Sequence, residues 1–126
     1  MKEMTPAHIV PVRVLDDVLS TQPPRRYLTK LDAQGFEMEV LAGATKLLET
    51  KQLRTIKVEI AGKFLLAQNT SAKELLRFLH RRGFFVSSDE AGAKPLTEDR
   101  VAQFAKSGDR DGFAQLDPAA RHTLTR

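Results

Sequence analysis

Residues 27–49, YLTKLDAQGFEMEVLAGATKLLE, constrain the fold most, because a strand-like segment in them runs through a glycine-containing turn into a helix-like segment. Residues 27–31 are predicted to form a β-strand. From residue 36, apolar side chains recur at the i, i+1, i+4, i+7 and i+8 spacing of a helix that packs on a sheet. We therefore predict one helix across 36–48, in a strand–turn–helix unit of the α/β class.

The rest of the chain alternates between the same two patterns. Extended chain is predicted at 12–14, a short helical turn at 15–19, and strands at 54–62, 84–88 and 112–116. One helix is predicted between Ser71 and Gly83, and another between Thr97 and Gly108. The first has the clearest limits, because Ser71 and Glu74 form an S-x-x-E capping box and Gly83 suits a left-handed C-terminal cap.

This alternation predicts an α/β fold with a mostly parallel sheet of about four strands, flanked by helices and joined by right-handed crossovers. The last strand is predicted as an antiparallel strand at the edge. With 126 residues, the chain is long enough to bury a core of its own. We expect a single domain over 1–126, with a lead-in at 1–26, an α/β core at 27–116 and a basic tail at 117–126.

The composition excludes several classes of chemistry. The chain has no cysteine, so it can form no disulfide, thiolate metal site or cysteine nucleophile, and this fits a reducing compartment. No apolar run reaches the ~18 residues of a membrane span, and no apolar segment of signal-peptide length opens the sequence. We therefore predict an intracellular, cytoplasmic protein with no membrane span.

Charge, aromatic content and histidine spacing argue against two classes of ligand, nucleic acids and metal ions. The net charge is +4, but the chain has one Tyr, no Trp and no nucleic-acid reading motif, which argues against nucleic-acid binding. His8, His80 and His122 have neither H-x-x-H nor H-E-x-x-H spacing, so no metal site is predicted.

The turn after the first core strand is the predicted functional site. In an open α/β sheet, ligands gather beyond the carboxyl ends of the strands, where Asp32 and Gln34 are expected. Gly35 removes a side chain, so the backbone can take a positive φ or approach a ligand closely. Glu37 and Glu39 fall in the first turn of the following helix, where the helix dipole favours acids. The pattern suits a ligand site and ordinary turn chemistry about equally.

The segments LTKLDAQGFEMEVLAGATKLL and IKVEI, with VPVRVLDDVL upstream, closely resemble the FkbM family of S-adenosylmethionine-dependent methyltransferases. The similarity covers roughly residues 9–86 and has several parts, which makes it stronger than one short motif. Gln34 stands where the family more often has Glu. The matching positions are Lys30, Asp32, Gly35, Glu37, Val40, Leu41, Gly43, Ala44, Val58 and Glu59.

The resemblance implies a Rossmann-like methyltransferase fold and transfer of a methyl group, usually to a hydroxyl oxygen. It implies Asp32 as the first candidate for a catalytic residue and Glu37 and Glu59 as second candidates. It also implies Asp32, Gln34 and Gly35 as cofactor-binding residues. The acceptor could be a small molecule, a sugar or a lipid.

The resemblance covers the carboxyl-terminal half of the family's catalytic domain, so we expect a partial fold that lacks the cofactor-binding first half. S-adenosylmethionine is then expected to bind weakly or not at all to this chain alone. The free edge of the strand at 27–32 would invite a second copy or a complementary chain, or the segments around Pro11 and Pro23 would fold over and cover it. The charges of Lys30, Asp32, Lys57 and Glu59 would suit a half-exposed sheet and could pair across its strands.

A second function stays open beside methyl transfer. The chain could be a noncatalytic module that uses the exposed sheet edge or its basic faces to bind a protein or nucleic acid.

Overall fold

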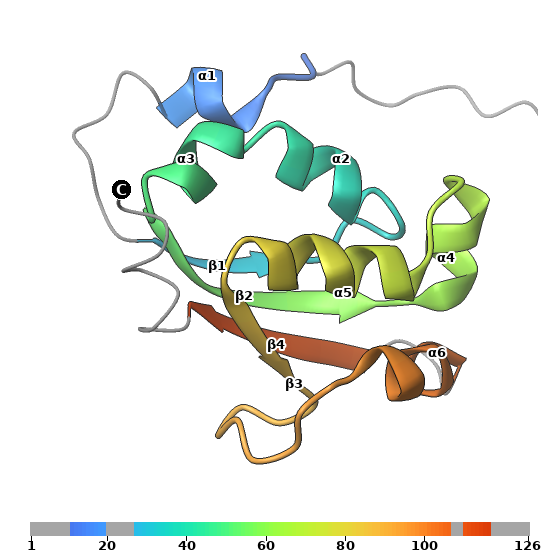
Figure 1. Ribbon diagram of the computed structural model, residues 1–126. Helices are drawn as coiled ribbons and strands as arrows, with labels where there is room; N and C mark the ends of the chain where they lie inside the picture. The colour runs from blue at the N-terminus through green and yellow to red at the C-terminus, as the bar shows by residue number, and fades with distance from the viewer. Residues whose placement is uncertain (1–10, 20–26, 107–109, 117–126) are drawn as a thin grey trace, which may run out of the picture.

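The computed structural model describes residues 11–19, 27–106 and 110–116, and its centre is a four-stranded sheet (Figure 1). The strands are β1 (Tyr27–Leu31), β2 (Leu53–Ile60), β3 (Phe84–Ser87) and β4 (Arg110–Leu116), in the order β1-β2-β4-β3. β1 runs parallel to β2, whereas β4 runs antiparallel to both β2 and β3.

The α/β class is confirmed, but the prediction of a mostly parallel sheet is wrong. β4 is antiparallel as predicted, yet it lies between β2 and β3 instead of at the edge. The connection after β3 explains this placement. Its helix α6 (Glu98–Lys106) packs against other helices at the carboxyl end of β2 and does not cross back over the sheet. The chain therefore re-enters the sheet where β2 ends, with Arg110 opposite Ile60.

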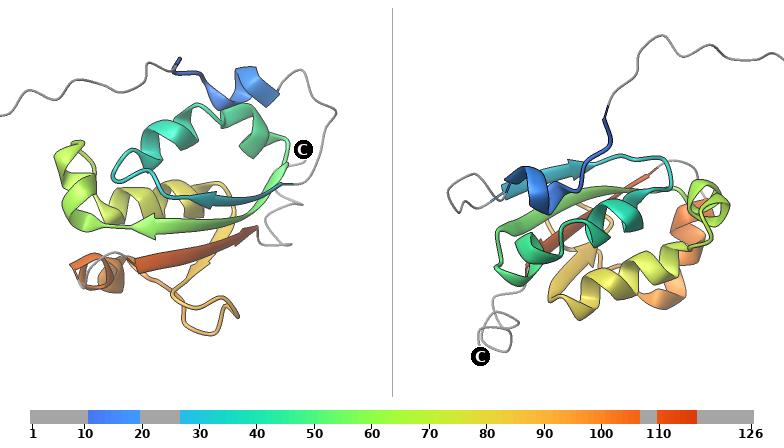
Figure 2. Two further views of the ribbon diagram at one scale, coloured as in Figure 1. Left: turned by 180° about the vertical axis from the view of Figure 1, so that it is seen from behind. Right: turned by 90° about the horizontal axis from the view of Figure 1, so that it is seen from above.

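The other helices lie on one face of the sheet, except α4, which lies beside α6 at the end of the sheet (Figures 1 and 2). They are α1 (Leu15–Leu19), α2 (Glu37–Ala42), α3 (Thr45–Glu49), α4 (Gly62–Ala67) and α5 (Ala72–Arg81). The structure confirms the predicted limits of α1 and β1. Residues 12–14, predicted to be extended, form no strand. The predicted helix end at Gly108 and the predicted tail at 117–126 lie outside the described residues.

The single helix predicted across 36–48 is in fact two helices, α2 and α3, separated at Gly43 and Ala44. Contacts from α1 stabilise the break. The N–H of Asp16 donates to the carbonyl of Gly43 at 2.8 Å. The Asp16 carboxylate then accepts from the N–H groups of Lys46 at 2.9 Å and Leu47 at 3.2 Å, so it caps α3 from another element.

The limits of α5 are as predicted. Ser71 Oγ accepts from the Glu74 N–H at 3.1 Å, and Gly83 follows the helix with φ +85°. The capping box is incomplete, because the Glu74 carboxylate accepts a hydrogen bond from the Thr70 hydroxyl at 2.8 Å. α4, directly after β2, is a helix that the sequence pattern did not predict.

The two faces of the sheet differ in character. Side chains on the helix-covered face are buried and form most of the core with the helices. From the strands these are Leu31, Ile56, Val58, Ile60, Phe84, Val86, Ala114 and Leu116. The opposite face, here called the open face, carries residues that are exposed or half-buried. These are Leu28, Lys30, Thr55, Lys57, Glu59, Phe85, Asp111, Phe113 and Gln115, whereas Ser87 on the same face is buried. None of the described helices has the length and apolar character needed to cross a membrane.

Candidate functional site

The candidate site lies beyond the carboxyl ends of β1 and β2, where the turn at 32–36 meets the start of α4. The backbone of this turn needs two unusual conformations. Gln34 has φ +47°, a left-handed value that is uncommon outside glycine, and Gly35 follows with φ +101°. The turn delivers the chain from β1 into α2.

The buried carboxylate of Glu37 holds this turn closed. Its Oε2 accepts from the Ala33 N–H at 2.6 Å, and its Oε1 accepts from the Gly35 N–H at 2.9 Å. Glu37 is only 1% exposed, so these two bonds replace the water that a carboxylate would otherwise bind. Glu37 therefore positions the turn. A direct catalytic role for Glu37 stays a prediction.

The turn requires a glycine at position 35, because another part of the protein backbone lies very close to it. A Cβ at this position would lie 2.3 Å from the backbone carbonyl oxygen of Phe64 in α4. The absence of a side chain at Gly35 thus lets the turn after β1 pack directly on the turn after β2. The structure confirms the predicted positive φ and identifies the close neighbour as protein backbone.

Asp32 and Glu59 come together at the same level of the sheet. Leu31 pairs with Val58 in the parallel register of β1 and β2, and Asp32 and Glu59 directly follow these two residues. Asp32 is exposed, whereas Glu59 is half-buried on the open face. Asp111 of β4 lies opposite Glu59. The structure thus brings two of the three predicted catalytic carboxylates to neighbouring strands, with Gln34 two residues beyond Asp32.

The charges on the open face pair differently from the sequence-based expectation. Lys30 lies opposite Lys57, an arrangement that brings like charges together. Lys57 instead makes an ion pair with Asp111 of β4 at 3.6 Å, and its ammonium lies 5.6 Å from the ring centre of Phe113. No group of three or more carboxylate or histidine side chains within the described ranges could hold a metal ion.

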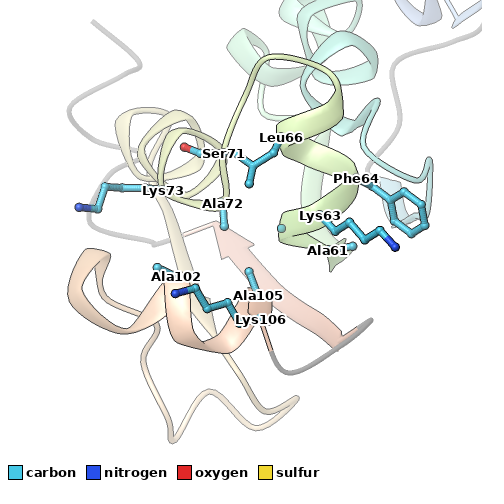
Figure 3. Close-up of a pocket in the computed structure, with 11 residues that line it drawn as sticks. Ala61, Lys63, Phe64, Leu66, Ser71, Ala72, Lys73, Ala102, Ala105 and Lys106 are labelled. Atoms are coloured by element: carbon cyan, nitrogen blue, oxygen red, sulfur yellow. The ribbon is translucent and has the colours of Figure 1, made fainter.

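A pocket of about 750 Å³ opens at the same end of the molecule, between α4, the start of α5 and the end of α6 (Figure 3). Sequence reasoning missed it, because its walls come from three segments that are far apart in the chain. The one local signal was the run of small residues at Ala61 and Gly62, directly after β2.

The residues of the turn fit part of an S-adenosylmethionine site. Asp32 and Gln34 are exposed and offer a carboxylate and an amide, which suit the cationic and hydrogen-bonding groups of that cofactor. The N–H groups of Ala33 and Gly35 are already bonded to Glu37. In the described part of the chain, β1 pairs only with β2, so its second edge, beside these groups, carries no further strand.

The comparison with protein families agrees with this geometry. The methyltransferase FkbM domain matches residues 5–86, more than half of the chain, and the match includes β1, the turn, α2, β2 and α5. No curated protein and no solved structure matches the chain. Because this match covers more than half of the sequence, the chain belongs to the FkbM methyltransferase family.

Proposed function

We propose that this chain takes part in S-adenosylmethionine-dependent methyl transfer to a hydroxyl oxygen of a small molecule, sugar or lipid. The family match supports the reaction class. The observation that carries the proposal is the placement of Asp32 level with Glu59 at the carboxyl end of β1 and β2. The cysteine-free sequence supports an intracellular location.

Each residue of the site has a proposed task. The cofactor, when bound, supplies an electrophilic methyl group. Asp32, exposed at the mouth of the turn, orients the acceptor hydroxyl and takes its proton. Glu59 provides a second carboxylate beside it, and Gln34 donates or accepts a hydrogen bond at the same rim. Glu37 acts on these groups through the turn that carries Asp32 and Gln34.

The other side of the site is proposed to come from a further polypeptide segment packed along β1. β1 pairs with β2 alone in the described sheet, so its second edge offers backbone N–H and C=O groups for pairing. A second copy of the chain or a complementary chain could supply that segment. We expect the isolated monomer to bind the cofactor weakly or not at all, because it contributes one wall only.

Calorimetric titration with S-adenosylmethionine, combined with a mass measurement by light scattering, tests both parts. We expect no measurable heat from the monomer and binding by an associated form. Asp32→Asn should weaken that binding about tenfold or more, the equivalent of about 1.4 kcal/mol, while the distant Asp99→Asn should not. Micromolar binding by a monomer would contradict the two-walled site. An associated form that does not bind S-adenosylmethionine would contradict the methyltransferase function.

A noncatalytic interaction module is the second candidate, and one observation favours it. Leu28 of β1 is 81% exposed on the open face, although strands usually bury such side chains. In this alternative, the open face and the β1 edge bind a protein or nucleic-acid partner. The discriminating result is an assembly that forms equally well with and without S-adenosylmethionine and has no affinity for it.

A further inference from the structure

The pocket between α4, α5 and α6 has an apolar interior made by very small side chains. Its volume of about 750 Å³ lies in the range of roughly 300–1,000 Å³ that is typical of small-molecule sites. Figure 3 shows side chains of both α4 and α6 along its walls. The small lining residues are Ala61, Gly62, Ala72, Ala102 and Ala105.

The rim of the pocket is positive. Lys63 of α4, Lys73 of α5 and Lys106 of α6 line it, and their amino groups extend from the wall in Figure 3. None of the lining residues is acidic. Glu74, next to Lys73 in the sequence, accepts a hydrogen bond from the Thr70 hydroxyl, and Glu98, whose charge also interacts with that of Lys73, is paired with Arg77.

The surroundings of the pocket also favour a negatively charged ligand. The pocket includes Ser71 and Ala72 at the start of the ten-residue helix α5, where the helix dipole contributes a partial positive charge. Leu66 of α4 is 68% exposed beside the apolar floor and extends the apolar surface toward the opening. An apolar interior with three cationic side chains among its lining residues is complementary to a molecule with an apolar body and one anionic end.

We propose that this pocket binds a small amphipathic anion, specifically a carboxylate with an aliphatic chain. Burial of its methylene groups in the apolar interior supplies most of the affinity. The lysines select the charged end and keep their ammonium groups in water, as long cationic side chains commonly do. This assignment is independent of methyl transfer, because it uses neither Asp32 nor the β1 edge.

Decanoate at a concentration below micelle formation is the probe, and isothermal titration calorimetry without S-adenosylmethionine is the measurement. We expect decanoate to bind at least tenfold more tightly than decanol, and decyltrimethylammonium to give no binding. Equal affinity for decanoate and the decyl cation would overturn the proposal, because the lysines would then select nothing. Binding to phosphatidylglycerol vesicles without binding of monomeric decanoate would also overturn it, in favour of a membrane surface.

Two variants locate the binding in this pocket. Ala102→Phe places a ring at an exposed position of the α6 wall and should abolish decanoate binding, whereas Ala42→Phe on α2 should not. The combined change Lys63→Gln, Lys73→Gln and Lys106→Gln should reduce decanoate affinity at least tenfold and leave decanol unchanged. Lys46→Gln on α3 is the matched control. Circular dichroism checks that each variant is folded. Unchanged decanoate binding in folded Ala102→Phe would overturn the assignment.

Discussion

At the scale of single residues, the turn at 32–36 depends on one buried carboxylate with two backbone donors. Glu37→Gln keeps the size of the side chain but leaves only one oxygen for the N–H groups of Ala33 and Gly35. We expect the free energy of unfolding to fall by about 1–3 kcal/mol, the usual cost of leaving a buried donor unsatisfied. Urea denaturation measures the change. Glu39→Gln, exposed on the same helix, is the control and should change stability by less than about 0.5 kcal/mol.

Gly35 gives a second prediction with an internal comparison. Gly35→Ala combines a strained φ of +101° with a contact of 2.3 Å to the Phe64 carbonyl oxygen. Gly92→Ala has a similar strain, at φ +78°, but its new Cβ would only touch Phe85 at 3.7 Å. We expect Gly92→Ala to cost about 1 kcal/mol and Gly35→Ala to cost clearly more, because backbone strain alone is about 1–3 kcal/mol. Equal losses in urea denaturation would show that the packing of the turn on α4 is unimportant.

The sequence could predict part of this site and not the rest. Asp32 at the end of a strand and Gly35 in a tight turn follow from local patterns, and the structure places both as expected. The clamp by Glu37 could not be foreseen, because it depends on a left-handed Gln34 that turns two N–H groups toward one carboxylate. A local pattern shows acids at a helix start but not where their side chains point.

At the scale of elements, Asp16 of α1 caps the N-terminus of α3. Asp16→Ala removes the acceptor for the Lys46 and Leu47 N–H groups, while the chain around it stays in place. We expect a loss of about 1 kcal/mol, as for other N-cap residues. Hydrogen exchange supplies a specific measurement, since the Lys46 and Leu47 amides should exchange faster. Glu90→Ala, in an exposed turn, should leave both amides unchanged.

The loop after β3 gives a prediction about pH. Hydrogen bonds from the backbone N–H groups of Ala93 and Lys94 hold the pKa of Asp89 below its usual value of 3.8. A carboxyl with a lowered folded pKa stabilises the fold above its unfolded pKa, and this contribution is lost as the pH falls through the folded value. The Ala93 and Lys94 amide shifts should therefore titrate below pH 3.8 in NMR spectra. Asp89→Asn should abolish that titration, and a midpoint above the usual value would contradict the interpretation.

Element prediction succeeded where the deciding interactions are local. α5 lies between Ser71 and Gly83 as predicted, because both signals stand directly beside the helix in the sequence. The break between α2 and α3 was missed, since a continuous apolar stripe crosses it and the cap at Asp16 lies 30 residues away from Lys46. β4 was identified as a strand, but its inner position depends on where α6 packs and not on any local period.

At the scale of the whole molecule, the sheet has helices on one face and an open face on the other (Figure 2). We propose that this face, with the β1 edge, contacts a second copy or another chain. Leu28→Ser should weaken self-association yet change monomer stability by less than about 0.5 kcal/mol, because Leu28 is 81% exposed. Leu66→Ser, at a leucine of α4 that is 68% exposed, is the matched control.

Sedimentation equilibrium measures this effect over a concentration series. A wild-type chain that stays monomeric up to about 1 mM, a limit that corresponds to about −4 kcal/mol of association free energy, would exclude the second copy as the partner. The proposed partner at the β1 edge would then have to be a complementary chain.

The inner position of β4 has a consequence for how the protein is made. β2 and β3 do not touch along their lengths until residues 110–116 insert between them. During synthesis, the sheet can therefore close only after residues 110–116 have left the ribosome, because this inner strand is translated after the other three. Premature stop codons upstream of that strand would leave two disconnected β elements with unsatisfied edges, a natural target for proteolysis.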